Sequence, residues 1–161
     1  MNYDIIKLVH ALAAVAATGP LLFAPWLSAR LAVSPAENKT VLLNGLAATD
    51  RFYNIAGWGL MLSGIALFWL QDWHRAFQLW FVLSVAIFVI DSLAEKRWRD
   101  PATTALAQLQ PGQEGWAENA ARLHKAVIAQ MACTALILLV MLLHSQLRIN
   151  LLTLSLWPWV S

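Results

Sequence analysis

The chain has 161 residues, of which 60% are hydrophobic and 12% charged, and its mean hydropathy is +0.59. Soluble domains carry about 25% charged residues, so this composition excludes an ordinary soluble domain and indicates a membrane protein. The formal net charge is only +2 and the basic residues lie beside apolar segments, so the pI of about 9.0 does not indicate a nucleic-acid partner. The single cysteine, Cys133, excludes a disulfide framework.

Four long apolar segments follow one another along the chain, at residues 8–29, 52–70, 76–93 and 126–143. About 20 apolar residues in a helix span a bilayer, because each residue rises about 1.5 Å and the hydrocarbon core is about 30 Å thick. The sequence therefore predicts an all-α, polytopic membrane protein, a single domain over residues 1–161 built as a four-transmembrane-helix bundle. We expect the helices at about residues 5–31, 52–70, 76–94 and 122–145.

The first segment is too long for the apolar region of a cleavable signal peptide, so we interpret it as the first membrane helix. Residues spaced three and four apart lie on one face of a helix and are expected to pack against neighbouring helices. In the first helix this face carries His10, Ala14, Ala17 and Leu21. In the second helix the corresponding face is predicted to hold Asn54, Gly57, Met61, Gly64 and Phe68.

The third and fourth segments are joined by a polar inner loop over residues 96–121, which two prolines and two glycines interrupt, with a short helix possible at residues 103–109. The fourth helix is predicted to present Gln130, Thr134, Ile137, Met141 and His144 on its inward face. An apolar tail follows at residues 149–160. It is too short to cross a bilayer again, so we expect it in the outer interface or against a neighbouring subunit.

The distribution of Lys and Arg predicts the orientation of the bundle. The connections between the first and second segments and between the third and fourth hold eight of the eleven basic residues. By the positive-inside rule these connections face the cytoplasm. The protein is therefore predicted to be a multi-pass protein of the bacterial inner membrane with both termini in the periplasm.

Three of the four histidines, His10, His74 and His144, fall near the outer boundary in this topology. Neutral imidazoles ligate haem iron, and two histidines on facing helices are typical of a b-type haem site. Gly57 and Gly64 would leave a smooth wall for a flat macrocycle. A histidine near a helix end is also commonly an interfacial or hydrogen-bonded group, so this alternative stays open. Met141, one turn before His144, gives a copper site as a further alternative.

A second polar group is predicted at the inner end of the bundle, formed by Asp50, Arg51, Asp91, Arg122 and His124. Charged groups at membrane depth are costly and are commonly paired, and Asp91 lies deepest, so a pairing with Arg51 or Arg122 is expected. This inner polar cluster either locks helix ends together or acts on an anionic head group or on protons.

Several of these features resemble a known group of proteins. The chain is similar to an uncharacterised bacterial family of four-span integral membrane proteins. The features that carry this resemblance are Lys7-x-x-His10 with Gly19 downstream, Asp50 at the start of the second helix, Gly64 late in that helix and the basic inner loop. That family is distantly similar to the CopD copper-resistance proteins and the HemJ protoporphyrinogen oxidases. The resemblance covers about residues 4–145 and places His10 where the HemJ branch associates a histidine with haem b. An Arg that follows the glycine closely in HemJ-like proteins appears here only at position 30, so the resemblance implies haem binding rather than protoporphyrinogen oxidation.

The sequence thus favours a small inner-membrane haem b or redox-associated protein that takes part in electron transfer, with His10 and His144 as candidate iron ligands. The alternatives are a non-enzymatic accessory or scaffold subunit that binds other membrane subunits or further copies of itself, and a copper-handling membrane protein. No phosphate-binding loop, dinucleotide fingerprint or nucleophile constellation is found, so nucleotide and nucleic-acid partners have no support, and whether the protein is an enzyme stays open.

Overall fold

A computed structural model describes residues 2–70, 73, 76–147 and 149, and over these residues the chain is helical without a β-strand. In chain order the elements are α1 (Asn2–Val33), the 3-10 turn η1 (Ala36–Asn38), α2 (Lys39–Trp69), α3 (Leu79–Ala94), the π-helical turn η2 (Glu95–Arg99), α4 (Asp100–Gln108) and α5 (Trp116–Leu142).

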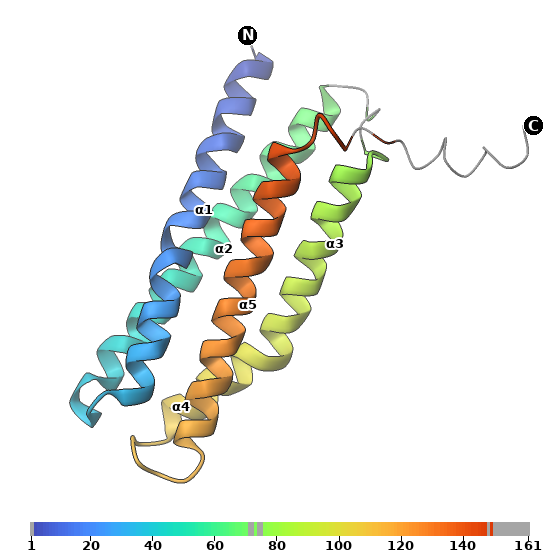
Figure 1. The fold of residues 1–161 in the computed structure, drawn as a ribbon. Helices are drawn as coiled ribbons and strands as arrows, with labels where there is room; N and C mark the ends of the chain where they lie inside the picture. The colour runs from blue at the N-terminus through green and yellow to red at the C-terminus, as the bar shows by residue number, and fades with distance from the viewer. Residues whose placement is uncertain (1, 71–72, 74–75, 148, 150–161) are drawn as a thin grey trace, which may run out of the picture.

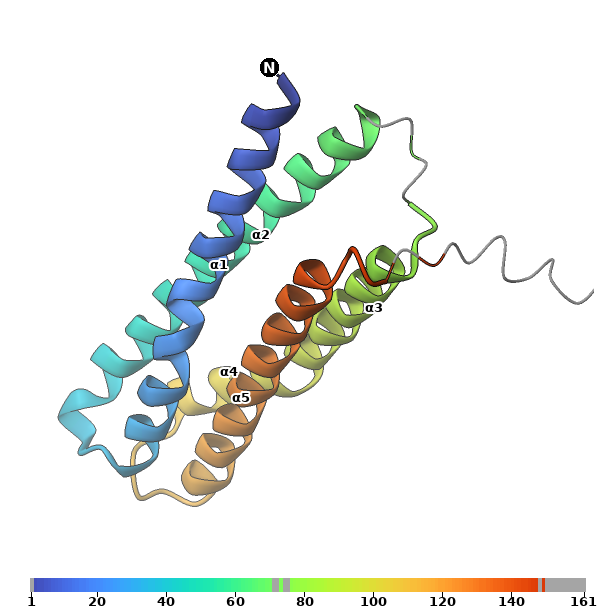
Figure 2. The ribbon, with the colours of Figure 1, turned by 45° about the horizontal axis from the view of Figure 1, so that its top comes forward.

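The four long helices run alternately up and down, so that both connections α1–α2 and α3–α5 lie at one end of the molecule (Figure 1). This end, which also holds α4, is called the α4 end below, and the N-terminus and the end of α5 lie at the opposite end. α1 packs against α2 and α5, and α5 also packs against α3 and α4. Figure 2 shows the result as two antiparallel pairs, α1 with α2 and α3 with α5, which meet along α1 and α5.

Among the described residues, three helical stretches are long and apolar enough to cross a membrane, at Tyr3–Val33, Ala36–Trp69 and Trp116–Leu142. The all-α, membrane-compatible architecture expected from the sequence is therefore confirmed. α3 has 16 residues and falls short of the length of about 20 that a span requires, because the α-helical pattern changes into the π turn where the charged sequence Glu95–Arg99 begins.

Two expected boundaries were wrong. The second helix begins at Lys39 rather than at residue 52, because Leu42, Leu43 and Leu46 supply apolar packing to a first part that looked like a polar connection. The predicted inner loop at residues 96–121 is mostly helical, since η2, α4 and the first turns of α5 occupy most of it. Both corrections lengthen the helical part of the α4 end.

The hydrophobic core is concentrated at this α4 end. Its buried members come from α1, α2, α4 and α5 and are Ala24, Leu31, Leu46, Ala102, Leu106, Trp116, Ala120, Leu123 and Val127. Lys39 is buried beside this core and donates hydrogen bonds from Nζ to the carbonyl oxygens of Ala107 and Leu109, at 2.9 and 2.6 Å. These carbonyls lie at the C-terminal end of α4, where helix carbonyls lack intrahelical partners and a cation is favourable. The hydrogen bonds of Lys39 therefore connect the start of α2 to the end of α4.

Candidate functional site

His10 lies on α1 and contacts α2 in the half of the bundle away from the α4 end. Its ring is half-buried, and Nδ1 lies 2.8 Å from Oγ of Ser63. On the same face of α2, a Cβ added to Gly64 would lie 3.6 Å from Cε1 of His10, an ordinary van der Waals contact. Gly64 therefore lets the imidazole lie directly against the helix backbone, which a larger side chain would prevent.

The hydrogen bonds of Ser63 assign the tautomer of His10. The single hydroxyl proton of Ser63 is directed to the carbonyl oxygen of Gly59, at 2.6 Å, with that of Leu60 at 3.1 Å. Oγ must then accept from Nδ1–H of His10, which leaves the lone pair of the neutral imidazole on Nε2. Metal-ligating histidines commonly have one nitrogen fixed in this way by a hydrogen bond, with the other nitrogen free to coordinate.

His144 lies just beyond the end of α5 and is exposed. Its Nδ1 lies 3.0 Å from the carbonyl oxygen of Met141, and because a carbonyl only accepts, Nδ1 carries the proton and Nε2 again keeps a lone pair. Its ring packs edge-on against the indole of Trp80 on α3, with centroids 6.2 Å apart. His10 and His144 thus share an end of the molecule and a tautomer, but His10 contacts α2 whereas His144 contacts α3.

The predicted inward faces agree with the structure on two helices and differ on the third. Ala17 and Leu21 of α1 and Gln130 and Thr134 of α5 are buried, as expected. On α2 Phe68 is buried, as predicted, whereas Asn54 and Met61 are exposed, so the face predicted for this helix was wrong at these two positions. The other buried side chains of α2, none of which was on the predicted face, are Lys39, Leu46, Thr49, Ala56 and Ser63. A Cβ added to Gly57 would meet no atom within 4 Å, so Gly57 does not share the close packing of Gly64.

An ion pair dominates the inner polar cluster, and its cation was not among the predicted residues. Arg99 is only 2% exposed and its guanidinium contacts the carboxylate of Asp50 on α2 and the amide oxygen of Gln130 on α5. Nε of Arg99 and Nε2 of Gln130 are buried without a hydrogen-bond partner among the described residues. Arg99 thus joins η2 to α2 through Asp50 and to α5 through Gln130, and these contacts fix the position of η2 between α2 and α5.

The π turn explains why Arg99 was missed. Arg99 belongs to the charged sequence Glu95–Arg99, and a run of charged residues normally indicates a solvated helix surface. Lys96, Arg97 and Trp98 are indeed exposed, whereas Arg99 is buried. A π turn adds residues to one turn and so changes which side chain faces the bundle, and such turns are frequent at functional sites. The sequence carries no local signal for the π turn, which depends on tertiary contacts.

Asp91 has a different partner from those predicted. Its Oδ2 accepts a hydrogen bond from Oη of Tyr53, at 3.3 Å, rather than pairing with Arg51 or Arg122. Oη of Tyr53 also lies 3.4 Å from the hydroxyl of Thr134, which donates to the backbone carbonyl of Gln130 at 3.0 Å. The two groups around Asp91 and Asp50 are therefore linked through α5.

The remaining members of the predicted cluster lie apart from this network. His124 on α5 pairs with Ser28 on α1, Nδ1 to Oγ at 2.9 Å, and Ser28 donates to the carbonyl oxygen of Pro25 at 3.0 Å. Arg122 forms an exposed pair with Glu118 one turn earlier, at 3.1 Å, and Arg51 is exposed. The structure therefore brings Asp50 and Asp91 into one network and leaves Arg51 and Arg122 at the surface.

Comparisons of the chain with protein-family models, with curated proteins and with solved structures find no match.

The described polar side chains therefore form two groups, one at each end of the bundle. At the end away from α4, His10 and His144 each offer an imidazole nitrogen with a free lone pair. At the α4 end, the buried carboxylate of Asp91 and the half-buried carboxylate of Asp50 lie beside an arginine, a tyrosine and a glutamine. No cluster of three or more His, Cys, Asp or Glu side chains suited to a metal ion occurs among the described residues. A cavity of about 150 Å³ lies elsewhere, between Thr18 and Leu21 of α1 and Met131 and Thr134 of α5. The predictions for His74 and for the apolar tail beyond Ile149 lie outside the described residues.

Proposed function

We propose that this chain is a small integral membrane protein that binds a b-type haem and transfers electrons, and that His10 and His144 are the residues that would hold its iron. The observation that carries the proposal is the hydrogen-bonded state of the two imidazoles. In each, Nδ1 is used by a fixed oxygen, and Nε2 is the nitrogen left to coordinate.

The donor set fits a b-type haem. Bound haem b supplies a one-electron couple, for which two neutral imidazoles are suitable ligands. Ser63 fixes the ring orientation of His10 because its own proton is used by the carbonyl of Gly59. Leu8, Val9 and Leu12 beside His10 on α1 are apolar, and the polarity of the surroundings affects the reduction potential of such a group.

The proposal includes a fourth membrane span formed by α3 with η2. α3 runs antiparallel to α5, and its outward side chains are apolar and exposed, which suits contact with lipid: Val82, Val85, Phe88, Val89, Ile90 and Leu93. The 16 residues of α3 form about 24 Å of α-helix, and the π-helical turn η2 extends this length. With four spans and basic connections at the α4 end, both termini lie outside and the α4 end lies in the cytoplasm of a bacterial cell.

An absorption spectrum of the purified protein tests the proposal. The protein is expressed in haem-replete cells and its spectrum is recorded in the oxidised and dithionite-reduced states, with a pyridine haemochrome assay on the same sample. We expect a b-type reduced spectrum with close to one haem per chain, lost in His10→Ala and weakened in His144→Ala. His124→Ala is the matched control, since His124 is also paired with a serine but lies at the opposite end of the bundle.

Other outcomes identify the alternatives. A flat spectrum overturns the haem proposal, and a colourless protein that co-purifies with a defined membrane complex supports an accessory subunit. Metal without porphyrin, lost in Met141→Leu and His144→Ala, supports copper handling, because a thioether and an imidazole suit Cu(I).

A further inference from the structure

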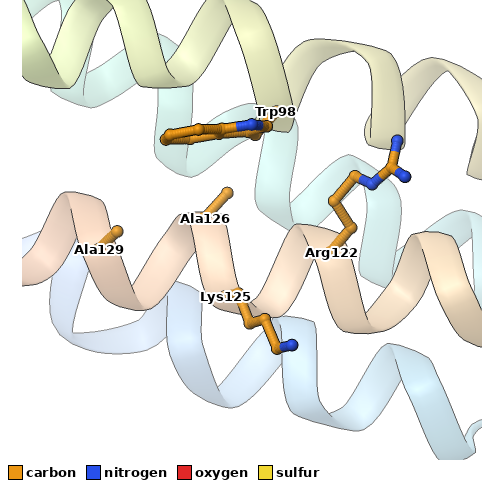
Figure 3. A pocket seen from close by; sticks show the side chains of 5 residues that line it. All are labelled: Trp98, Arg122, Lys125, Ala126 and Ala129. Atoms are coloured by element: carbon orange, nitrogen blue, oxygen red, sulfur yellow. The ribbon is translucent and has the colours of Figure 1, made fainter.

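A cavity of about 340 Å³ opens between η2 and α5 at the α4 end of the bundle. Figure 3 shows its lining: the indole of Trp98 from η2 stands across from Ala126 and Ala129 on α5, and the guanidinium of Arg122 lies on the same side of α5. Lys125 also lines the cavity, but its side chain projects away from Trp98. The cavity is separate from His10 and His144 and from the Asp50–Arg99 ion pair.

The cavity combines an apolar wall with a cationic rim. Trp98 is 54% exposed although it lies beside a helix that packs against the bundle, and Ala126 and Ala129 leave space below it because their side chains are small. Arg122 is half-exposed and uses one of its five N–H donors for Glu118. Surface ion pairs of this kind contribute about 0–1 kcal/mol, so the contact with Glu118 leaves Arg122 available to a stronger anion.

We infer that this cavity binds an anionic phospholipid, with the phosphate held by Arg122, Lys125 as a second cation of the rim, and an acyl chain lying against Trp98, Ala126 and Ala129. Basic pockets between membrane helices are suited to anionic head groups, and tryptophan is favoured at the level of those head groups. Arginine suits phosphate in particular, because its planar guanidinium donates two parallel hydrogen bonds.

The apolar wall distinguishes a lipid from a free anion. A phosphate ion would use the two cations alone, whereas a lipid also covers the exposed indole and the two alanines. The position of the cavity agrees with this, since it lies along α5, the most apolar of the three candidate spans, close to the start of that span.

The test is native mass spectrometry of the full chain in a neutral detergent, titrated with dioctanoyl phosphatidylglycerol and, separately, with dioctanoyl phosphatidylcholine. We expect phosphatidylglycerol to bind more tightly. Because each cation near an anionic surface contributes about a fivefold increase in binding, Arg122→Gln with Lys125→Gln should weaken phosphatidylglycerol about thirtyfold. Lys96→Gln with Arg97→Gln is the matched control, because it removes the same charge from exposed neighbours of Trp98 that do not line the cavity.

Three results would overturn the inference. The first is equal binding of the two lipids, and the second is an equal loss in the control variant, which would indicate attraction by overall charge. The third is displacement of phosphatidylglycerol by excess inorganic phosphate, which would leave a simple anion site. If Arg122→Gln with Lys125→Gln fails to fold, Ala129→Leu fills the apolar wall while keeping every charge. It should weaken phosphatidylglycerol binding, and unchanged binding would contradict the inference as well.

Discussion

Nδ1 of His10 on α1 lies 2.8 Å from Oγ of Ser63 on α2, and Ser63 is only 7% exposed. This hydrogen bond joins the two longest helices in the half of the bundle that lacks the main hydrophobic core. Between membrane helices apolar burial contributes little, because lipid is as apolar as the side chains it replaces. Polar contacts and close packing must therefore hold α1 to α2 here.

A double-mutant cycle between His10→Ala and Ser63→Ala should measure this contact. Hydrogen bonds between membrane helices contribute about 0.6 kcal/mol on average, so we expect a coupling free energy of about that size in unfolding by SDS in mixed micelles. Thr18→Ala serves as the control partner, since Thr18 bonds only to carbonyls of its own helix. Strictly additive effects of His10→Ala and Ser63→Ala would show that the bond does not form.

Arg99 should be the most sensitive charged residue of the chain. Asp50→Ala leaves its guanidinium buried without a counter-ion, and removing one partner of a buried pair costs about 3–5 kcal/mol. Replacing both, with Asp50→Leu and Arg99→Met, should cost less than Asp50→Ala, because neither charge of this ion pair then remains buried. The free energy of unfolding of each variant checks this order. Arg97→Met, at an exposed position of the same turn, should change it by no more than about 0.5 kcal/mol.

Tyr53→Phe should destabilise the protein by about 1–2 kcal/mol, because it leaves the carboxylate of Asp91, which is 5% exposed, without its phenol donor. Thermal unfolding in detergent measures the effect. The chain has one other tyrosine, and Tyr3→Phe provides the control because it removes a phenol far from the polar network. Equal effects of the two substitutions would contradict the assignment of Tyr53 as the partner of Asp91.

The sequence was sufficient for the class of fold and for part of the site. Long apolar runs predict membrane helices directly, and the spacing of Gln130 and Thr134 indicated the inward face of α5 correctly. It was insufficient where a contact comes from a distant element. Lys39 is buried because carbonyl oxygens at the end of α4 accept its hydrogen bonds, and Arg99 is inward because η2 is a π turn. Neither the distant acceptors nor the π turn leaves a periodic signal in the local sequence.

The side of the membrane reached by each connection should be measurable with single cysteines. In a Cys133→Ala background, Gln113→Cys reports on the α4–α5 connection and Ser145→Cys on the end of α5. If α3 crosses the bilayer, a membrane-impermeant maleimide added to intact cells should label position 145 and leave position 113 protected. If only the other three helices cross, α5 runs in the opposite direction across the membrane. The pattern would then be reversed, with position 113 labelled and position 145 protected.

Gly57 and Gly64 lie on the same helix but differ in how closely another helix approaches them. A Cβ added to Gly64 would lie 3.6 Å from Cε1 of His10, whereas no atom lies within 4 Å of a Cβ added to Gly57. Gly64→Leu should therefore displace His10 from Ser63, lower the free energy of unfolding and reduce the His10-dependent absorbance of a haem-loaded sample. Gly57→Leu adds the same volume at a position where the new Cβ meets no neighbour, so its free energy of unfolding should stay within about 0.5 kcal/mol of the parent value. Gly64→Ala adds only a methyl group at van der Waals distance and should be tolerated. Equal losses of stability in Gly57→Leu and Gly64→Leu would contradict this prediction. The effect of both substitutions would then come from helix propensity or lipid contact rather than from the close approach of His10 to α2.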